Sequence, residues 1–235
     1  MADVGIFPPH SDDGELTLGA TTRGLLEDGH RVWVVLMTTG VNSGAQPGTG
    51  LSKEEFGRAR DDEQQRAARR LGIRPEHILI GPDRVADGDL TVAAAETVIR
   101  EWLILVADLA EYSELDVGDV WVKTTTNLGG SVQHPDHRNA GQAAVNLLRA
   151  GDIQPNGLRL GIEQYQLQAW KAANPSLASK VMTDTASPAV VRAALDVYGE
   201  EDSAGWKFGI GHRSVASAFA TVRANPVSYY HVPVF

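Results

Sequence analysis

The stretch FPPHSDDGELTLG, residues 7–19, places His10 close to two adjacent carboxylates, Asp12 and Asp13. Like charges at close range resist joint ionisation, so this crowding is costly for an isolated segment. A bound cation removes that cost, because it attracts the carboxylates and accepts a lone pair from the imidazole. The stretch therefore predicts part of a metal site whose other ligands come from elsewhere in the chain.

A second cluster of the same chemistry lies in HPDHRNAG, where Asp136 stands between His134 and His137. Together the two clusters offer imidazole nitrogens and carboxylate oxygens. A catalytic zinc site commonly has three such protein ligands and an open position for water. One aspartate of an adjacent pair can bind the cation while its neighbour takes a proton from the bound water. The chemistry that this favours is hydrolysis of an unactivated carbonyl.

Both clusters follow short apolar segments that read as strands, DVGIF (3–7) and DVWVKTTT (119–126). In open α/β sheets, ligands bind at the carboxyl ends of the strands. If the two strands run parallel in one sheet, the clusters meet at the same edge.

The rest of the chain alternates between helical and strand-like patterns. We expect further strands at 30–40, 77–81 and 158–167, and helices at 15–28, 52–71, 91–109, the second part of 134–150, 188–198 and 214–223. This alternation indicates an α/β fold with a largely parallel sheet. No clear linker interrupts it, so we expect one domain over residues 1–235.

Composition excludes several classes of protein. The formal charge of −9 argues against a basic surface for nucleic acid, and the absence of cysteine excludes disulfides and Cys-type zinc sites. The N-terminus lacks the features of a signal peptide, and the apolar run WLILVADLA is too short to span a bilayer. We therefore expect a cytoplasmic protein with neither a nucleic-acid partner nor a membrane span.

The two clusters resemble the motifs of the LmbE-like or PIG-L-like metal-dependent de-N-acetylases. The first family motif, His-X-Asp-Asp followed by a Leu-Gly stretch, stands here as PHSDDGELTLGA, and the second, His-Pro-Asp-His, is intact at 134–137. The segments TTG, RDDE, AARRLGI and DGDL also look like family segments. The resemblance covers residues 3–150 well and implies a Rossmann-like three-layer sandwich. The C-terminal part from about residue 150 is divergent, and we assign substrate specificity to it.

Carried over residue by residue, the resemblance implies a role for each member of the clusters. The implied metal ligands are His10, Asp13 and His137, usually for zinc, with another divalent cation as the alternative. Asp12 would be the general base. His134 would stabilise the oxyanion and protonate the departing amine, and Asp136 would orient an imidazole, most simply that of His134.

Three more residues are weighed as substrate-binding groups. Arg60 matches an arginine near the sugar pocket of relatives, although a helix-surface ion pair explains it equally well. Asp87 matches an acid at the pocket rim, although turn chemistry with Gly88 is an alternative. His212 could close over the pocket or serve a structural role. Val132 stands where some relatives carry a polar or aromatic group, which leaves open how the oxyanion site is completed.

The implied function is a hydrolase that removes an N-acetyl or related N-acyl group from a small amino sugar or glycoconjugate. A metal-dependent phosphoesterase is the first alternative, since His/Asp clusters on α/β sheets also hold paired metals. A non-catalytic sugar-binding relative is the second, although it would be expected to lose Asp12 or His134. The exact substrate stays open, and so does the oligomeric state, a homo-oligomer included.

Overall fold

The computed structural model describes residues 1–113, 120–129, 134–200 and 215–233 of the chain. Within these residues, one seven-stranded sheet has the order β3-β2-β1-β4-β5-β7-β6. The strands are β1 (Asp3–Phe7), β2 (Arg31–Val35), β3 (Ile78–Leu79), β4 (Val120–Thr125), β5 (Leu158–Ile162), β6 (Met182–Thr185) and β7 (Val227–His231). The first five strands pair in parallel, and β7 runs antiparallel to both of its neighbours. The mainly parallel sheet predicted from the sequence is confirmed.

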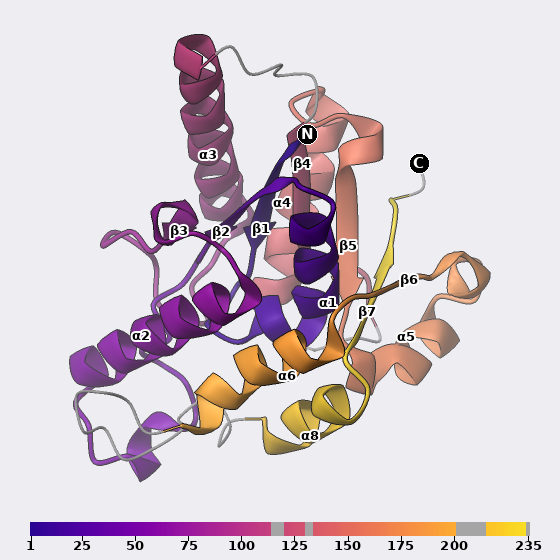
Figure 1. Cartoon of the computed structure of the whole chain (residues 1–235). Coiled ribbons are helices and arrows are strands. Elements are labelled where there is room, and N and C mark those ends of the chain that lie inside the picture. The colour runs from indigo at the N-terminus through magenta and orange to yellow at the C-terminus, as the bar shows by residue number, and fades with distance from the viewer. Residues whose placement is uncertain (114–119, 130–133, 201–214, 234–235) are drawn as a thin grey trace.

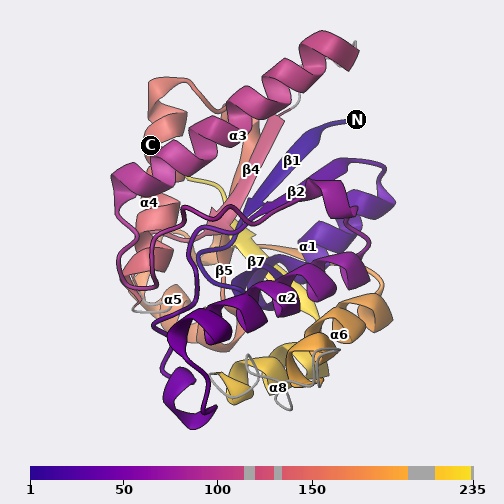
Figure 2. The same cartoon turned by 90° about the vertical axis from the view of Figure 1, so that its left-hand side faces the viewer.

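Helices cover both faces of this sheet (Figures 1 and 2). The helices are α1 (Asp13–Glu27), α2 (Lys53–Leu71), α3 (Val92–Ser113), α4 (Pro135–Ala150), α5 (Leu167–Ala173), α6 (Pro188–Asp196) and α8 (Ala216–Ala224). One layer contains α1, α2, α6 and α8, and the opposite layer contains α3 and α4. The three-layer, Rossmann-like arrangement is thus confirmed. The single-domain organisation stays a prediction, with which a sheet shared by both halves of the chain agrees. No helix in the described part of the chain is long and apolar enough to cross a membrane.

Apolar side chains fill the space on both sides of the sheet. Phe7 packs edge-on against Trp102 of α3, with their ring centroids 5.3 Å apart, in the core beneath α3 and α4. On the other face, Tyr198 and Phe219 from the C-terminal part pack with Leu16 of α1. The C-terminal helices therefore complete the layer that covers the start of α1, where the first His/Asp cluster lies.

The strand order places a crevice between β1 and β4. From β1 the chain passes to β2 and β3 on one side of the sheet, and it then returns to form β4 on the other side. At such a switch point the two following loops separate and leave a crevice at the carboxyl ends, where open α/β sheets bind ligands. The two His/Asp clusters follow these two strands, so the sheet itself brings them together.

Several elements differ from those predicted: β2 ends at Val35 and not near residue 40, and helix α5 was not predicted. Helix α1 begins at Asp13 and not at residue 15, because Asp12 is its N-cap residue. Strand β5 ends at Ile162 and does not continue to 167: its pairing with β4 stops at Gly161, its pairing with β7 stops at Ile162, and a 3-10 turn follows at Gln164–Gln166. Strands β6 and β7 were not predicted, since their short segments lack a strong alternating pattern.

Two features of α4 bring the second cluster to the sheet edge. A Cβ atom at Gly141 would lie only 2.4 Å from the carbonyl oxygen of Thr125, so only glycine lets α4 approach the end of β4 this closely. The Thr125 hydroxyl also donates a hydrogen bond to the carbonyl oxygen of His137, at 2.9 Å. The first turn of α4 is therefore fixed directly above the end of β4.

Strand β4 also buries a lysine that takes no part in the site. Lys123 is fully buried, donates a hydrogen bond of 3.1 Å to the carbonyl oxygen of Gly157, and lies over the ring of Trp121. Burial lowers its pKa from the ordinary value of 10.5 to about 7, and the positive charge of Arg159 adds to this effect. The folded state therefore holds the Lys123 proton less tightly than the unfolded state does.

We expect Lys123→Met to raise the free energy of unfolding by about 2 kcal/mol or more near pH 6, because it removes a buried charge. Below pH 7 both states carry this charge, so the penalty is complete. Between pH 7 and the ordinary lysine value the unfolded state binds more protons, so the parent gains stability as pH rises. Urea unfolding at pH 6 and pH 10 checks this. If Lys123→Met raised the free energy of unfolding equally at both pH values, this expectation would be contradicted.

Candidate functional site

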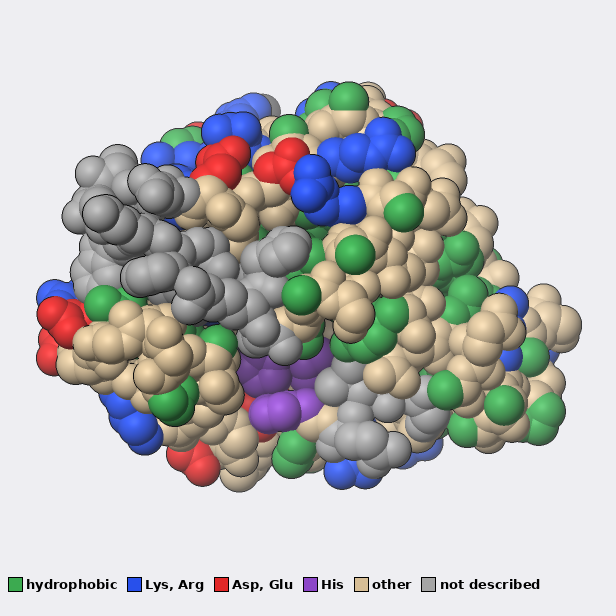
Figure 3. Space-filling view, turned by 90° about the horizontal axis from the view of Figure 1, so that it is seen from below, with side chains coloured by type: hydrophobic (Ala, Val, Ile, Leu, Met, Phe, Trp, Pro, Cys, Tyr) green, Lys and Arg blue, Asp and Glu red, His purple; other side chains and the backbone are tan. Residues whose placement is uncertain are grey.

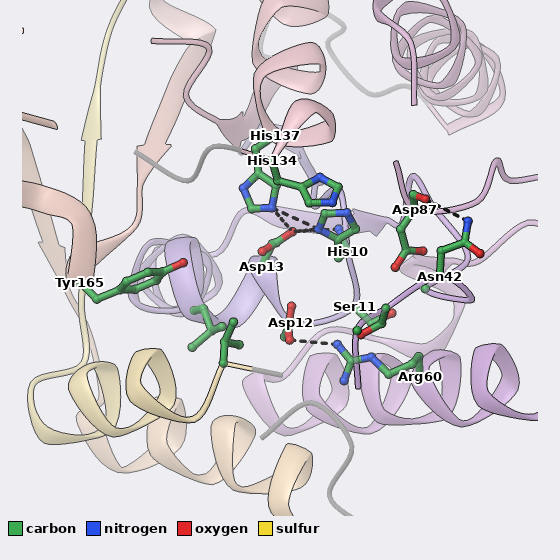
Figure 4. A pocket seen from close by; sticks show the side chains of 15 residues that line it. His10, Ser11, Asp12, Asp13, Asn42, Arg60, Asp87, His134, His137 and Tyr165 are labelled. Atoms are coloured by element: carbon green, nitrogen blue, oxygen red, sulfur yellow. Dashed lines mark hydrogen bonds and ion pairs between the residues drawn. The ribbon is translucent and has the colours of Figure 1, made fainter. Parts of the chain in front are cut away.

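A cavity of about 240 Å³ opens at the carboxyl edge of the sheet. Its histidines are visible at the bottom of a hollow in Figure 3, and Figure 4 shows the side chains that line it. Seven residues predicted from the sequence line this cavity: His10, Asp12, Asp13, Arg60, Asp87, His134 and His137. His212 lies outside the described residues, and so does Val132.

Three ligand atoms from the two clusters converge in this cavity. Asp13 Oδ2 lies 3.0 Å from His10 Nδ1 and 3.1 Å from His137 Nε2. The two imidazole nitrogens are themselves 3.1 Å apart, although the residues are 127 positions apart in the chain. The three atoms thus form a nearly equilateral triangle (Figure 4). Two nitrogens and one oxygen are the donor set of a catalytic zinc site, so the residues fit this metal.

The charges at this triangle explain why a cation suits it. Burial opposes ionisation of Asp13, but the nearby His137 and His10 hold the pKa of Asp13 well below its usual range. Burial likewise disfavours a charged His10, but the hydrogen bond and charge of Asp13 raise the pKa of His10 to about 9. A divalent cation competes with protons for these same lone pairs, since ligating imidazoles must be deprotonated.

The carboxylate of Asp136 lies closer to the ring of His10 than to the ring of His134. Its Oδ2 lies 3.1 Å from His10 Nε2 and accepts a 2.7 Å hydrogen bond from the backbone N–H of Gly88. The distance from the same oxygen to His134 Nδ1 is 3.8 Å. Asp136 thus contacts an imidazole as expected, but the partner at hydrogen-bond distance is His10 and not His134, which was the simplest candidate. The reason is that His134 is the N-cap of α4, whose ring accepts instead from the Asp136 backbone N–H at 3.4 Å.

One further carboxylate at the site, that of Glu163, was missed in the sequence. Glu163, the first residue after β5, is buried, and its Oε1 lies 2.9 Å from His137 Nδ1. Extending the expected strand to residue 167 placed Glu163 inside it and hid this position. The signal that would have found it is the one used for the two clusters, a carboxylate directly after an apolar strand of a parallel sheet.

Asp12 lies apart from the metal triangle and has its own partner. Arg60 of α2 donates a 2.9 Å hydrogen bond to Asp12 Oδ2 and also pairs with Glu63. All three side chains are buried, so Arg60 is not part of a helix-surface ion pair. Burial raises the pKa of Asp12, which the charge of Arg60 opposes. This pairing leaves the Arg60 guanidinium engaged by protein, although the side chain lines the cavity.

His134 is the most exposed member of the two clusters, with 38% of its side chain accessible. Its ring packs edge-on against that of His10, with centroids 4.6 Å apart. Burial lowers the pKa of His134, and the positive charge of His10 lowers it further. His134 therefore faces the cavity as a neutral imidazole near pH 7.

The loop around Asp87 joins the site on its open side. Gly88 has a φ of +89°, so the turn predicted from Asp-Gly is present, and Asn42 donates to the Asp87 carbonyl oxygen at 3.1 Å. Asp87 also lines the cavity, and its Oδ1 is buried without a hydrogen-bond partner among the described residues. Asp87 thus belongs to a turn and also lies at the rim of the cavity.

Tyr165 is a second residue that the sequence did not single out. It lies in the turn after β5, lines the cavity, and directs its hydroxyl toward the histidine cluster (Figure 4). Burial raises the pKa of Tyr165 well above its usual range, and the negative charges of Glu163 and Asp13 add to this effect. The phenol therefore keeps its proton and remains a hydrogen-bond donor.

Solved structures with the same fold include two deacetylases and a hydratase. The N,N'-diacetylchitobiose deacetylase from Pyrococcus horikoshii is 21% identical to this chain, with a TM-score of 0.51. The aligned region covers 73% of this chain and 69% of the deacetylase. The A40926 pseudoaglycone deacetylase is 18% identical, covers 98% and 96%, and has a TM-score of 0.62. The 4-carboxy-2-hydroxymuconate hydratase from Pseudomonas putida KT2440 is 16% identical, covers 100% and 97%, and has a TM-score of 0.52. At these identities the likeness shows the fold alone.

The family to which the chain belongs is shown by a match to a family model of sequences. A search of curated proteins finds no match. The family model PIG-L, described as GlcNAc-PI de-N-acetylase, matches residues 6–148. This match spans more than half of the chain and contains both clusters whose side chains meet in the cavity. The chain therefore belongs to the PIG-L family of GlcNAc-PI de-N-acetylases.

Proposed function

We propose that the protein is a zinc-dependent hydrolase that removes an N-acetyl or related N-acyl group from an amino-sugar-containing molecule. The observation that carries this proposal is the separation of two neighbouring carboxylates. Asp13 Oδ2 lies 3.0 and 3.1 Å from two imidazole nitrogens, whereas the carboxylate of Asp12 faces the same cavity and, within the described part of the chain, is hydrogen-bonded to Arg60 alone. One carboxylate can thus hold a cation while the other remains available as a base.

His10, Asp13 and His137 would hold the metal. A divalent cation bound by such ligands lowers the pKa of water to roughly 7 and polarises a carbonyl group. The donor set supports zinc, since zinc accepts imidazole nitrogen and carboxylate oxygen together. Another divalent cation remains the alternative.

Asp12 would accept the proton of the attacking water, and this proton would then pass to the amine nitrogen as the carbon–nitrogen bond breaks. Its raised pKa makes it a stronger base than an exposed aspartate, and Arg60 fixes the direction of its carboxylate. Because Oδ2 accepts from Arg60, Oδ1 is the oxygen that we assign to the proton. Glu63 holds the other side of the guanidinium, so the base cannot turn away without breaking a buried ion pair.

Two uncharged donors would serve the oxygen that becomes negative on the amide carbonyl. His134 offers a ring N–H from the first turn of α4, and Tyr165 offers its hydroxyl from the turn after β5. Donors placed before the reaction stabilise this charge without reorganisation. Tyr165 is thus our answer to how the oxyanion site is completed in a chain that has Val132 at the position of a polar group in some relatives.

We expect Tyr165→Phe to lower kcat for deacylation by about 100-fold, the effect typical of one lost oxyanion donor. KM and zinc content should change little, because the phenol contacts neither the metal ligands nor a ground-state group. The matched control is Tyr229→Phe, which removes a hydroxyl of β7 that does not line the cavity. Equal kcat values for the two variants would contradict the assignment.

The proposed function is tested by product release. The zinc-loaded protein is incubated with a panel of N-acetylated amino sugars and glycoconjugates and, separately, with phosphoesters, and acetate and phosphate are measured. Acetate without phosphate supports the proposal. Phosphate without acetate would support the phosphoesterase instead, and zinc binding without either product would support the non-catalytic relative. The cytoplasmic location and the oligomeric state stay predictions that this assay does not address.

A phosphoesterase of this type needs a second metal ion, and the site offers few separate ligands for one. A second group of potential ligands in the described residues consists of His10, His134 and Asp136. It shares His10 with the first group, and Asp136 already accepts hydrogen bonds from His10 and Gly88. No separate bridging carboxylate is present among these five side chains, so the hydrolase with one metal ion is favoured.

A further inference from the structure

The end of β5 brings a carboxylate to the metal ligands from outside the family motifs. Glu163 lies beyond residues 6–148, the range that the family model matches. It is only 2% exposed, and its Oε1 is 2.9 Å from Nδ1 of His137, which precedes it by 26 residues. A buried carboxylate is costly, so its position against a single imidazole nitrogen calls for a reason.

The two ring nitrogens of His137 face different partners. Nε2 points to Asp13 Oδ2 and His10 Nδ1, both at 3.1 Å, whereas Nδ1 points to Glu163. A neutral imidazole has one N–H and one lone pair. When Glu163 accepts the N–H at Nδ1, the lone pair lies on Nε2 and faces the other two ligand atoms. Glu163 therefore selects the tautomer in which His137 can bind a metal.

His10 shows the same arrangement with the other carboxylate. Its Nδ1 faces the ligand atoms, and its Nε2 lies 3.1 Å from Asp136 Oδ2. Each ligand histidine thus has one nitrogen at the metal position and a buried carboxylate at the other. Such partners fix the ring and raise its basicity toward the metal.

The backbone of His137 is fixed independently of Glu163. The Thr125 hydroxyl holds the carbonyl oxygen of His137 at 2.9 Å, which anchors the residue but leaves the ring free to turn about its side-chain bonds. Among the described residues, Glu163 is the group that contacts the far side of the ring. Ring orientation is therefore the property that depends on it.

We propose that Glu163 is a positioning residue that fixes the tautomer and orientation of the His137 ring and thereby strengthens zinc binding at the His10–Asp13–His137 site. This inference rests on the metal site of the proposed function. It also gives the C-terminal part of the chain, which carries β5, a direct part in the metal chemistry.

The test is a zinc-affinity measurement that does not depend on any substrate. Glu163→Gln and Glu163→Ala are titrated with zinc in competition with a chromophoric chelator at pH 7.5. We expect weaker binding by about 10-fold for glutamine, which keeps an acceptor oxygen, and by up to about 100-fold for alanine. The matched control is Glu63→Gln, which removes a buried carboxylate that pairs with Arg60 and not with a histidine of the metal site. The control should bind zinc as tightly as the parent.

Circular dichroism and thermal unfolding of the metal-free proteins separate this role from a structural one. A merely structural role would lower the melting temperature of the Glu163 variants and leave the zinc affinity of the folded protein unchanged. Folded Glu163→Gln that binds zinc as tightly as the parent would overturn the inference while leaving the proposed function intact. A parent that binds no zinc would overturn both.

Discussion

Asp12→Asn should reduce deacylation by about 10²- to 10⁴-fold while the protein still binds one equivalent of zinc, because general-base catalysis contributes about this much. The asparagine side chain has the shape of aspartate and keeps an oxygen for the hydrogen bond from Arg60, now 2.9 Å long. It cannot take up a proton from water. The measurement is kcat for acetate release together with metal content.

Asparagine is preferable to alanine here because of the buried charges behind Asp12. Alanine would leave Arg60 with Glu63 alone, and breaking a buried ion pair on one side is costly, by about 3–5 kcal/mol. A loss of activity could then reflect a disturbed fold. Asp62→Asn is the matched control, since Asp62 is a more exposed aspartate of α2 that pairs with Arg66. An Asp12→Asn variant as active as this control would refute the assignment of the base.

Asp13→Ala should lose both zinc and activity. Asp13 Oδ2 is the one atom of the metal triangle that contacts both imidazoles, and it also accepts a 2.9 Å hydrogen bond from the His10 backbone N–H. Without it, two nitrogens remain, and a stable catalytic zinc site ordinarily has three protein ligands. Zinc content after dialysis should fall to background, and acetate release should fall with it.

The comparison of the two aspartate variants is more informative than either alone. Asp12→Asn with zinc and Asp13→Ala without zinc would show that neighbouring carboxylates have separate tasks. If both variants kept zinc, Asp13 would not be a ligand. If both lost it, Asp12 would belong to the metal site, and the base would have to be sought elsewhere in the cavity.

The fold by itself does not decide the reaction. Two deacetylases and a hydratase share it at similar levels of likeness. Function lies in the side chains that the fold places at its binding edge. In this chain those side chains are the three atoms proposed as metal ligands, a separate carboxylate proposed as the base, and the hydrogen-bond donors His134 and Tyr165. This combination and the family match together favour deacylation.

The meeting of His10, Asp13 and His137 was predictable from the sequence because the position of each depends on local information. His10 and Asp13 follow one apolar strand, and His137 follows another, with a helix starting at or next to each cluster. Strands that alternate with helices run parallel, and their carboxyl ends share an edge. The strand pattern alone therefore predicted that these three residues would meet.

Tertiary structure decided which partner each of these residues has. The contacts of Asp136 with His10 and of Arg60 with Asp12 join positions 126 and 48 residues apart. Their lengths depend on the packing of α4 and α2 against the sheet to within an ångström, which no hydrophobic pattern encodes. A pattern shows that Arg60 is on a helix, but only packing shows that its charge is buried beside the base.

The part played by the C-terminal segment was decided by strand pairing. The letters LRLGIEQYQL read as one strand, but the pairing of β5 stops at Gly161 on the side of β4 and at Ile162 on the side of β7. The chain then turns and presents Glu163 and Tyr165 to the cavity. Where strand pairing stops is a property of the sheet and not of the segment. The sequence by itself thus determined which His and Asp side chains meet at the sheet edge, and the tertiary structure determined which groups contact and surround them.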